Sequence, residues 1–277
     1  MKIAVSAWSF HEPLYAGRLR QSDVPAEVAA LGFRHVELLE MFLWRKPPGI
    51  LERVLRRAIP PASPTVDYSH ATLHELAGAR LRAGTQLVCW AVDTDLTIAD
   101  ADTRHAQLAH LATAIEAARF LGAPMLRITT GGKEGEADAV GRAVDTLRAV
   151  LPAAMARGVK LAVENHLDLS ADPNMLVEIV TALKSPYVGV CLDLGNFREG
   201  QAGEGIKLLA PHAIHVHAKS HSFSADGEET TIHYGMAMQA LRSAGYEGML
   251  SIEFEGDGLP ANGIRNTKAL IDKYWIG

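Results

Sequence analysis

Eight short apolar segments recur along the chain, and this repetition limits the possible folds more than any other feature. They are KIAVSAW (2–8), HVELLE (35–40), QLVCWAV (86–92), PMLRITT (124–130), VKLAVEN (159–165), VGVCLDL (188–194), AIHVHAK (213–219) and MLSIEFE (249–255). Most are followed by a loop with Gly, Asp or Pro and then by a longer stretch of helical period. This alternation predicts parallel strands covered by helices.

The intervening stretches predict helices at 103–122, 136–158, 173–185 and 234–245, several of which end in Gly as a helix C-cap does. The segment 45–84 is the weakest unit because it holds several prolines, so an irregular course is also expected there. Eight alternations in 277 residues match the size of one α/β barrel. We therefore predict an α/β fold, a (β/α)8 TIM barrel, with residues 1–277 forming one domain.

Composition excludes several classes of protein. Hydrophobic residues make up 48% and charged residues 21%, as in ordinary globular proteins. A net charge of −5 gives no basic field for nucleic acid, and no apolar run approaches the length of about 18 residues that suggests a membrane span. Cys89 and Cys191 lie in apolar runs, which indicates buried thiols in a reducing compartment. We expect a cytoplasmic protein without nucleic-acid or membrane partners, and a homo-oligomer remains open.

Each of the last four predicted strands carries at least one acid or imidazole near its C-terminal end. In AIHVHAK, one face carries His215, His217 and Lys219, while the alternating residues are apolar. With the same phase, the inward residues of the other three strands are Glu164, His166, Asp193, Glu253 and Glu255. The C-terminal ends of barrel strands carry the chemistry of TIM-barrel enzymes, so these side chains are expected to meet at one polar centre.

The expected centre contains three carboxylates and one imidazole, from Glu164, Asp193, Glu253 and His217. Three converging carboxylates would repel one another without a cation. A mostly oxygen ligand set suits a hard divalent ion, so we predict Mn²⁺ first, with Mg²⁺, Co²⁺ or Zn²⁺ as alternatives. Four protein ligands leave positions open for substrate oxygens.

The segments LAVENH (161–166), VGVCLDLGNF (188–197), HVHAKSHSFSADGEE (215–229) and AGYEGMLSIEFEG (244–256) resemble the sugar phosphate isomerase/epimerase group of the xylose isomerase-like TIM-barrel superfamily. The resemblance implies the same four metal ligands, a proton-transferring pair in Glu164 and Glu253, and substrate contacts from His166 and Lys219. Two positions depart from the ketose 3-epimerases, since Asn196 stands in place of a histidine and Phe223 in place of an arginine. These departures count against epimerisation of a free ketose at carbon 3.

Other residues are candidates for contact with a carbohydrate substrate: Arg127, Asn196, His215, Trp8 and Trp90. Each also has a structural interpretation. His215 fits a satisfied interior histidine, Arg127 fits a partner for the barrel acids, and the tryptophans fit ordinary packing.

The predicted activity is that of a metal-dependent sugar isomerase or epimerase, in which a glutamate removes a proton beside a carbonyl and the metal stabilises the enediolate. A lyase acting on 3-keto-glycosides would need the same base and metal. A DNA-repair endonuclease of the superfamily would need a basic face and a histidine-rich, multi-metal site. Outside enzymes, a degenerate sugar-binding barrel remains an alternative.

Overall fold

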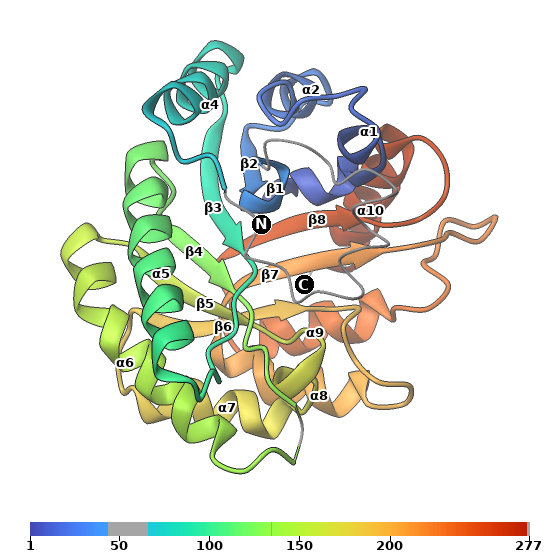
Figure 1. The fold of residues 1–277 in the computed structure, drawn as a ribbon. Coiled ribbons are helices and arrows are strands. Elements are labelled where there is room, and N and C mark those ends of the chain that lie inside the picture. The colour runs from blue at the N-terminus through green and yellow to red at the C-terminus, as the bar shows by residue number, and fades with distance from the viewer. Residues whose placement is uncertain (44–65, 134, 276–277) are drawn as a thin grey trace.

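The computed structural model describes residues 1–43, 66–133 and 135–275 (Figure 1). Eight parallel strands close into a barrel in chain order, and β8 pairs with β1 to complete it. They are β1 (Lys2–Ser6), β2 (His35–Leu39), β3 (Gln86–Val92), β4 (Met125–Ile128), β5 (Lys160–Glu164), β6 (Val188–Asp193), β7 (Ala213–Ser220) and β8 (Met249–Phe254). The predicted (β/α)8 barrel is confirmed, and no strand end differs from its prediction by more than two residues.

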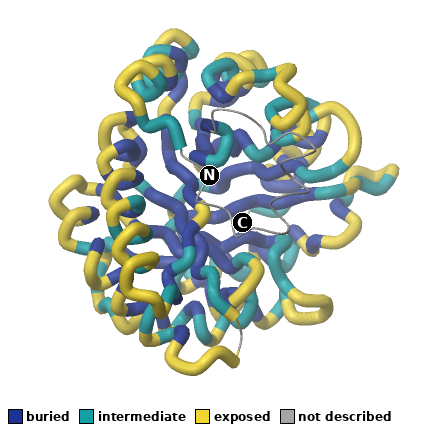
Figure 2. The backbone as a smooth tube through the Cα atoms, viewed as in Figure 1, coloured by how far each residue is buried: buried dark blue, intermediate teal, exposed yellow. Residues whose placement is uncertain are grey.

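Helices cover the outside of the barrel, with their outer faces exposed and the strands between them buried (Figure 2). The α-helices are α1 (His11–Tyr15), α2 (Val24–Ala30), α4 (His70–Ala83), α5 (Ala101–Leu121), α6 (Ala139–Arg157), α7 (Pro173–Ala182), α8 (Ala202–Leu209), α9 (Tyr234–Ser243) and α10 (Pro260–Trp275). Short 3-10 helices follow three of the strands, η1 (Ala7–Phe10), η2 (Glu40–Leu43) and η3 (Asp168–Ala171), and η4 (Ala210–His212) connects α8 to β7. Among the described residues, no helix has both the length and the apolar character needed to cross a membrane.

The helix ends follow the glycine signals of the sequence. Gly84, Gly122 and Gly158 end α4, α5 and α6 in the left-handed conformation, which glycine adopts without the steric cost of a Cβ atom. The four predicted helices are present as α5, α6, α7 and α9. Much of the segment 45–84 lies outside the described residues, and its last part forms α4.

Two apolar clusters of described residues pack on the two sides of the strands. The large cluster joins the outward residues of the strands to the helices, and it includes Val5 of β1. The neighbouring Ala4 faces the lumen because side chains alternate along a strand, and it packs in a smaller cluster with Cys89. Met125 and Met249, which begin β4 and β8, pack against that smaller cluster. Apolar side chains therefore line part of the lumen toward the N-terminal ends of the strands, and the carboxylates gather toward the opposite ends.

Candidate active site

Four strands deliver a cluster of ligand-type side chains to the C-terminal end of the barrel. Glu164 ends β5 and Asp193 ends β6, while His217 and Glu253 lie near the ends of β7 and β8. One ligand atom from each lies within 4.8 Å of the others, and all four residues are buried. The strand register places Asp193 directly beside His217. The structure thus brings together the four residues that the sequence indicated.

The atoms of this cluster fit a divalent metal ion. His217 Nδ1 lies 2.7 Å from Glu164 Oε1, 3.5 Å from Glu253 Oε1 and 3.7 Å from Asp193 Oδ2. Glu164 Oε2 and Asp193 Oδ2 are buried and accept no hydrogen bond from the described residues. Although Arg127 Nε and Lys219 Nζ lie within 3.4 Å of these two oxygens, three carboxylates with one imidazole form a ligand set for a hard divalent ion.

Two buried cations neutralise part of the cluster. Lys219 Nζ lies 2.8 Å from Glu255 Oε1, and it is 3.1 Å from both Asp193 Oδ2 and Asn196 Oδ1. On the opposite side, Arg127 Nη1 donates to Asp93 Oδ1 at 2.7 Å, and Arg127 Nε faces Glu164 Oε2 at 3.4 Å without forming a hydrogen bond. Both cations therefore already have carboxylate partners.

Two glutamates of the cluster, Glu164 and Glu253, lie in different electrostatic environments. Burial raises the pKa of Glu253 to about 7, and the neighbouring charges of Asp193 and Glu164 add to that rise against the opposing effects of His217 and Lys219. Burial alone would also raise the pKa of Glu164, but the positive charges of Arg127 and His217 lower it well below its usual range. Paired carboxyl groups with such different environments are common where one site needs both an acid and a base.

A small cavity of about 190 Å³ opens beside this cluster. Its lining residues are Trp8, Leu39, Met41, Asp93, Arg127, Glu164, His166, Lys219, Glu253 and Glu255. Trp8 Nε1 donates to Glu255 Oε1 at 2.5 Å, which fixes the indole against the cavity wall. Of the expected substrate contacts, Trp8, Arg127, His166 and Lys219 line the cavity. Asn196 does not line it, but its Oδ1 accepts a hydrogen bond from the cavity-lining Lys219.

Trp90 and His215 also do not line the cavity. Trp90 pairs in register with Leu38, which alternates with the cavity-lining Leu39, so Trp90 faces the helices instead. Its indole is fully buried and donates to Tyr68 Oη at 3.3 Å. His215 is also fully buried and bonds within the lumen. In the structure, Trp90 and His215 therefore lie away from the cavity that the other candidates line.

The sequence analysis did not single out Glu37, which lies on β2. Its Oε1 is 3.0 Å from His217 Nε2 and its Oε2 is 2.7 Å from His215 Nε2. All three side chains are fully buried. The available signal was the period of two in HVELLE, which places Glu37 on the same face as Leu39.

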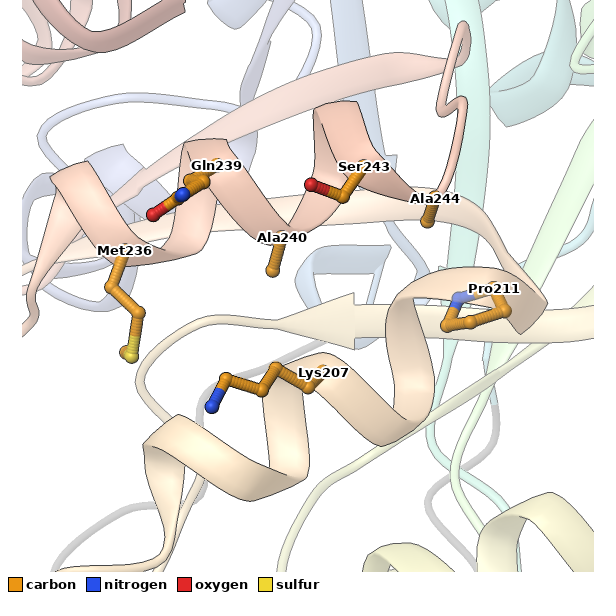
Figure 3. Close-up of a pocket in the computed structure, with 7 residues that line it drawn as sticks. All are labelled: Lys207, Pro211, Met236, Gln239, Ala240, Ser243 and Ala244. Carbon is orange, nitrogen blue, oxygen red and sulfur yellow. The ribbon is translucent and has the colours of Figure 1, made fainter.

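A larger groove of about 530 Å³ lies on the outside of the barrel between α8 and α9 (Figure 3). Its lining residues are Lys207, Pro211, Met236, Gln239, Ala240, Ser243 and Ala244, which include neither a carboxylate nor an imidazole. Size alone does not identify the reactive site, because proton transfer and metal binding require the groups found in the smaller central cavity.

Residues 25–274 match the family model of the xylose isomerase-like TIM barrel. The chain belongs to this family. Among solved structures, the xylose isomerase-like fold recurs in D-psicose 3-epimerase crystallised with D-fructose, with 16% identity, full coverage of both chains and a TM-score of 0.72. It recurs in the IOLI protein with a bound zinc atom, with 18% identity, 99% coverage of both chains and a TM-score of 0.73.

A curated relative matches over a short stretch. The 3'-dehydrocarminate deglycosidase alpha subunit of Microbacterium sp is 36% identical to this chain over 56 residues. That match covers 20% of this chain and spans 16% of the length of the relative.

Proposed function

We propose that this protein is a divalent-metal-dependent sugar isomerase or epimerase that moves a proton at a carbon beside a carbonyl. The observation that carries the proposal is the convergence of Glu164, Asp193, His217 and Glu253 at the edge of a cavity. Two similar structures support it, a 3-epimerase of a keto sugar and a protein of the same fold with bound zinc. The degenerate sugar-binding barrel is disfavoured because the ligand set and both glutamates are present.

The four clustered residues would hold the ion, which when bound would act as a Lewis acid on the substrate carbonyl. Glu164 and Glu253 both line the cavity but come from different strands, so they can approach one substrate carbon from two sides. One carboxylate removes the proton, and the other returns a proton to the same carbon, giving an epimer, or to the neighbouring carbon, giving an isomer. Ser6 Oγ donates to Glu253 Oε1 at 3.1 Å and orients that carboxylate.

The charges around the cavity favour a sugar without a phosphate group. Arg127 and Lys219 are the cations among the described residues that line the cavity, and both are paired with carboxylates. A phosphate would have to displace those partners, whereas sugar hydroxyls can donate to Glu255 and Asp93 without doing so. Trp8 offers the flat apolar surface on which a sugar ring packs.

A lyase acting on 3-keto-glycosides is the second candidate. The short match to the 3'-dehydrocarminate deglycosidase alpha subunit favours it. Such a lyase would use the same glutamate and metal to remove a proton beside a ketone, and it would then expel the glycosidic oxygen instead of receiving the proton back. The two candidates therefore differ in the fate of the substrate and share the residues that start the reaction.

The test is proton exchange with solvent. Metal-loaded protein is incubated in D₂O with neutral ketoses, their phosphates and 3-keto-glycosides, and products are followed by NMR and mass spectrometry. We expect deuterium at the carbon beside the carbonyl of a neutral sugar, with Gln239→Ala in the outer groove behaving as wild type. Release of the aglycone would instead establish the lyase. Absence of both reactions in metal-loaded protein across the panel would contradict the proposal.

A further inference from the structure

Glu37 contacts the side of the His217 ring that faces away from the proposed metal centre. His217 Nε2 lies 3.0 Å from Glu37 Oε1, while Nδ1 of the same ring lies 2.7 Å from Glu164 Oε1. Asp193 and Glu253 also approach Nδ1 and not Nε2. Since Glu37 and His217 have no exposed surface, bulk water cannot replace either partner. Nε2 of His217 therefore contacts Glu37, whereas Nδ1 faces the other three residues of the proposed metal site.

We propose that Glu37 is a positioning residue that keeps the proton of His217 on Nε2, leaves the lone pair of Nδ1 for the metal ion, and thereby strengthens metal binding. This inference rests on the proposed function, because it presupposes the four-residue metal site. A carboxylate that accepts a hydrogen bond at Nε2 requires a proton there, and a neutral imidazole has only one proton. Carboxylates in this position fix the tautomer and ring orientation of metal-bound histidines.

His215 holds Glu37 in that position. Its Nε2 lies 2.7 Å from Glu37 Oε2, so each carboxylate oxygen has its own imidazole partner. The rings of His215 and His217 are nearly perpendicular, with their centroids 5.4 Å apart. Because a carboxylate held at both oxygens cannot rotate away, the contact to His217 is fixed before any ion arrives.

Glu40 provides a matched control on the same segment. It is also a buried glutamate paired with an imidazole, since its Oε2 lies 3.1 Å from His110 Nε2, and it accepts from Tyr68 Oη as well. These partners lie outside the four-residue cluster. A Glu40→Gln change therefore reproduces the loss of a buried carboxylate without touching a proposed metal ligand.

The experiment measures Zn²⁺ affinity by chelator competition in wild type, Glu37→Gln and Glu40→Gln. Loss of a partner that orients a ligand typically lowers metal affinity about 10- to 100-fold, and we expect that loss for Glu37→Gln with wild-type affinity for Glu40→Gln. In parallel, NMR of ¹⁵N-histidine-labelled, zinc-loaded wild type reports the His217 tautomer directly. We expect the proton on Nε2 and zinc on Nδ1.

The possible outcomes separate this inference from the proposed function. Equal zinc affinity of Glu37→Gln and wild type, or a wild-type His217 with its proton on Nδ1, would overturn the role of Glu37 while the metal site stands. If neither wild type nor Glu40→Gln binds zinc, the metal site of the proposed function is contradicted, independently of the role of Glu37. If Glu37→Gln does not fold, the tautomer of His217 in zinc-loaded wild type alone tests the role of Glu37.

Discussion

The two halves of the barrel share one architecture but contribute different chemistry to the site. Each strand from β5 to β8 places a proposed metal ligand at the centre. The first half contributes Ser6, Glu37 and Arg127, and each of these contacts a ligand from the second half: Glu253, His217 and Glu164, respectively. A symmetric scaffold can therefore carry an asymmetric site, in which the second half supplies the proposed ligands and the first half contributes residues that orient them and neutralise part of their charge.

The largest effect is expected from the two glutamates of the second half. Glu164→Gln or Glu253→Gln removes a proton acceptor while keeping the shape of the side chain, so turnover should fall by about 10²- to 10⁴-fold, the usual contribution of general acid–base catalysis. Circular dichroism should show a retained fold. Substantial turnover in both variants would assign proton transfer to other residues and remove the functional distinction between the halves.

The next prediction tests whether Arg127 in the first half of the barrel neutralises the carboxylate of Glu164 in the second half. Arg127→Met removes one of the positive neighbours of the buried Glu164, and breaking a buried ion pair costs about 3–5 kcal/mol. Chemical denaturation should show this loss in the free energy of unfolding of metal-free protein, and a smaller loss once Mn²⁺ is bound. Arg148→Met, which removes an exposed pair with Asp145, serves as the control. Equal stability of metal-free Arg127→Met and wild type would contradict the neutralising role.

Two tryptophans of the first half sharpen the comparison further. Trp8 lines the cavity and donates to Glu255, whereas Trp90 faces the helices and donates to Tyr68. Trp8→Phe should raise KM, on the order of tenfold or less, because the bond that fixes the cavity wall is lost. Trp90→Phe should leave KM unchanged and lower the free energy of unfolding by about 1 kcal/mol. If Trp90→Phe raised KM in steady-state kinetics and Trp8→Phe lowered only the free energy of unfolding, Trp90 and not Trp8 would be the tryptophan at the site.

The smallest effect concerns a pair in the first half that lies away from the site. The hydrogen bond to Glu40 raises the pKa of His110, against the opposing effect of burial. A raised folded-state pKa means that the pair stabilises the fold fully below the ordinary imidazole pKa of about 6.5, and that this contribution is lost as pH rises through the folded-state value. Denaturation of wild type and His110→Gln should differ more at low pH, by less than about 1 kcal/mol. A difference that grows with pH would contradict this assignment.

The sequence predicted which four residues cluster because β7 and β8 alternate polar and apolar residues toward their C-terminal ends, while β5 and β6 each end in a carboxylate that follows apolar residues. The strand QLVCWAV offers no such phase, since nearly all its residues are apolar, and the direction of Trp90 required the register with β2. Glu37 stood alone among apolar neighbours, and its importance depends on His217, which lies 180 residues away in the chain. Partners across the lumen are set by barrel closure, which local sequence does not encode.

The most direct test of the central claim is elemental analysis of purified protein after chelation and reloading with a mixture of divalent ions. Asp193→Ala is measured beside wild type, because Asp193 is a proposed ligand but does not line the cavity. The account predicts near-stoichiometric divalent metal in wild type and its loss in Asp193→Ala. Wild-type protein that retains no metal would contradict the metal centre and the proton-transfer mechanism built around it.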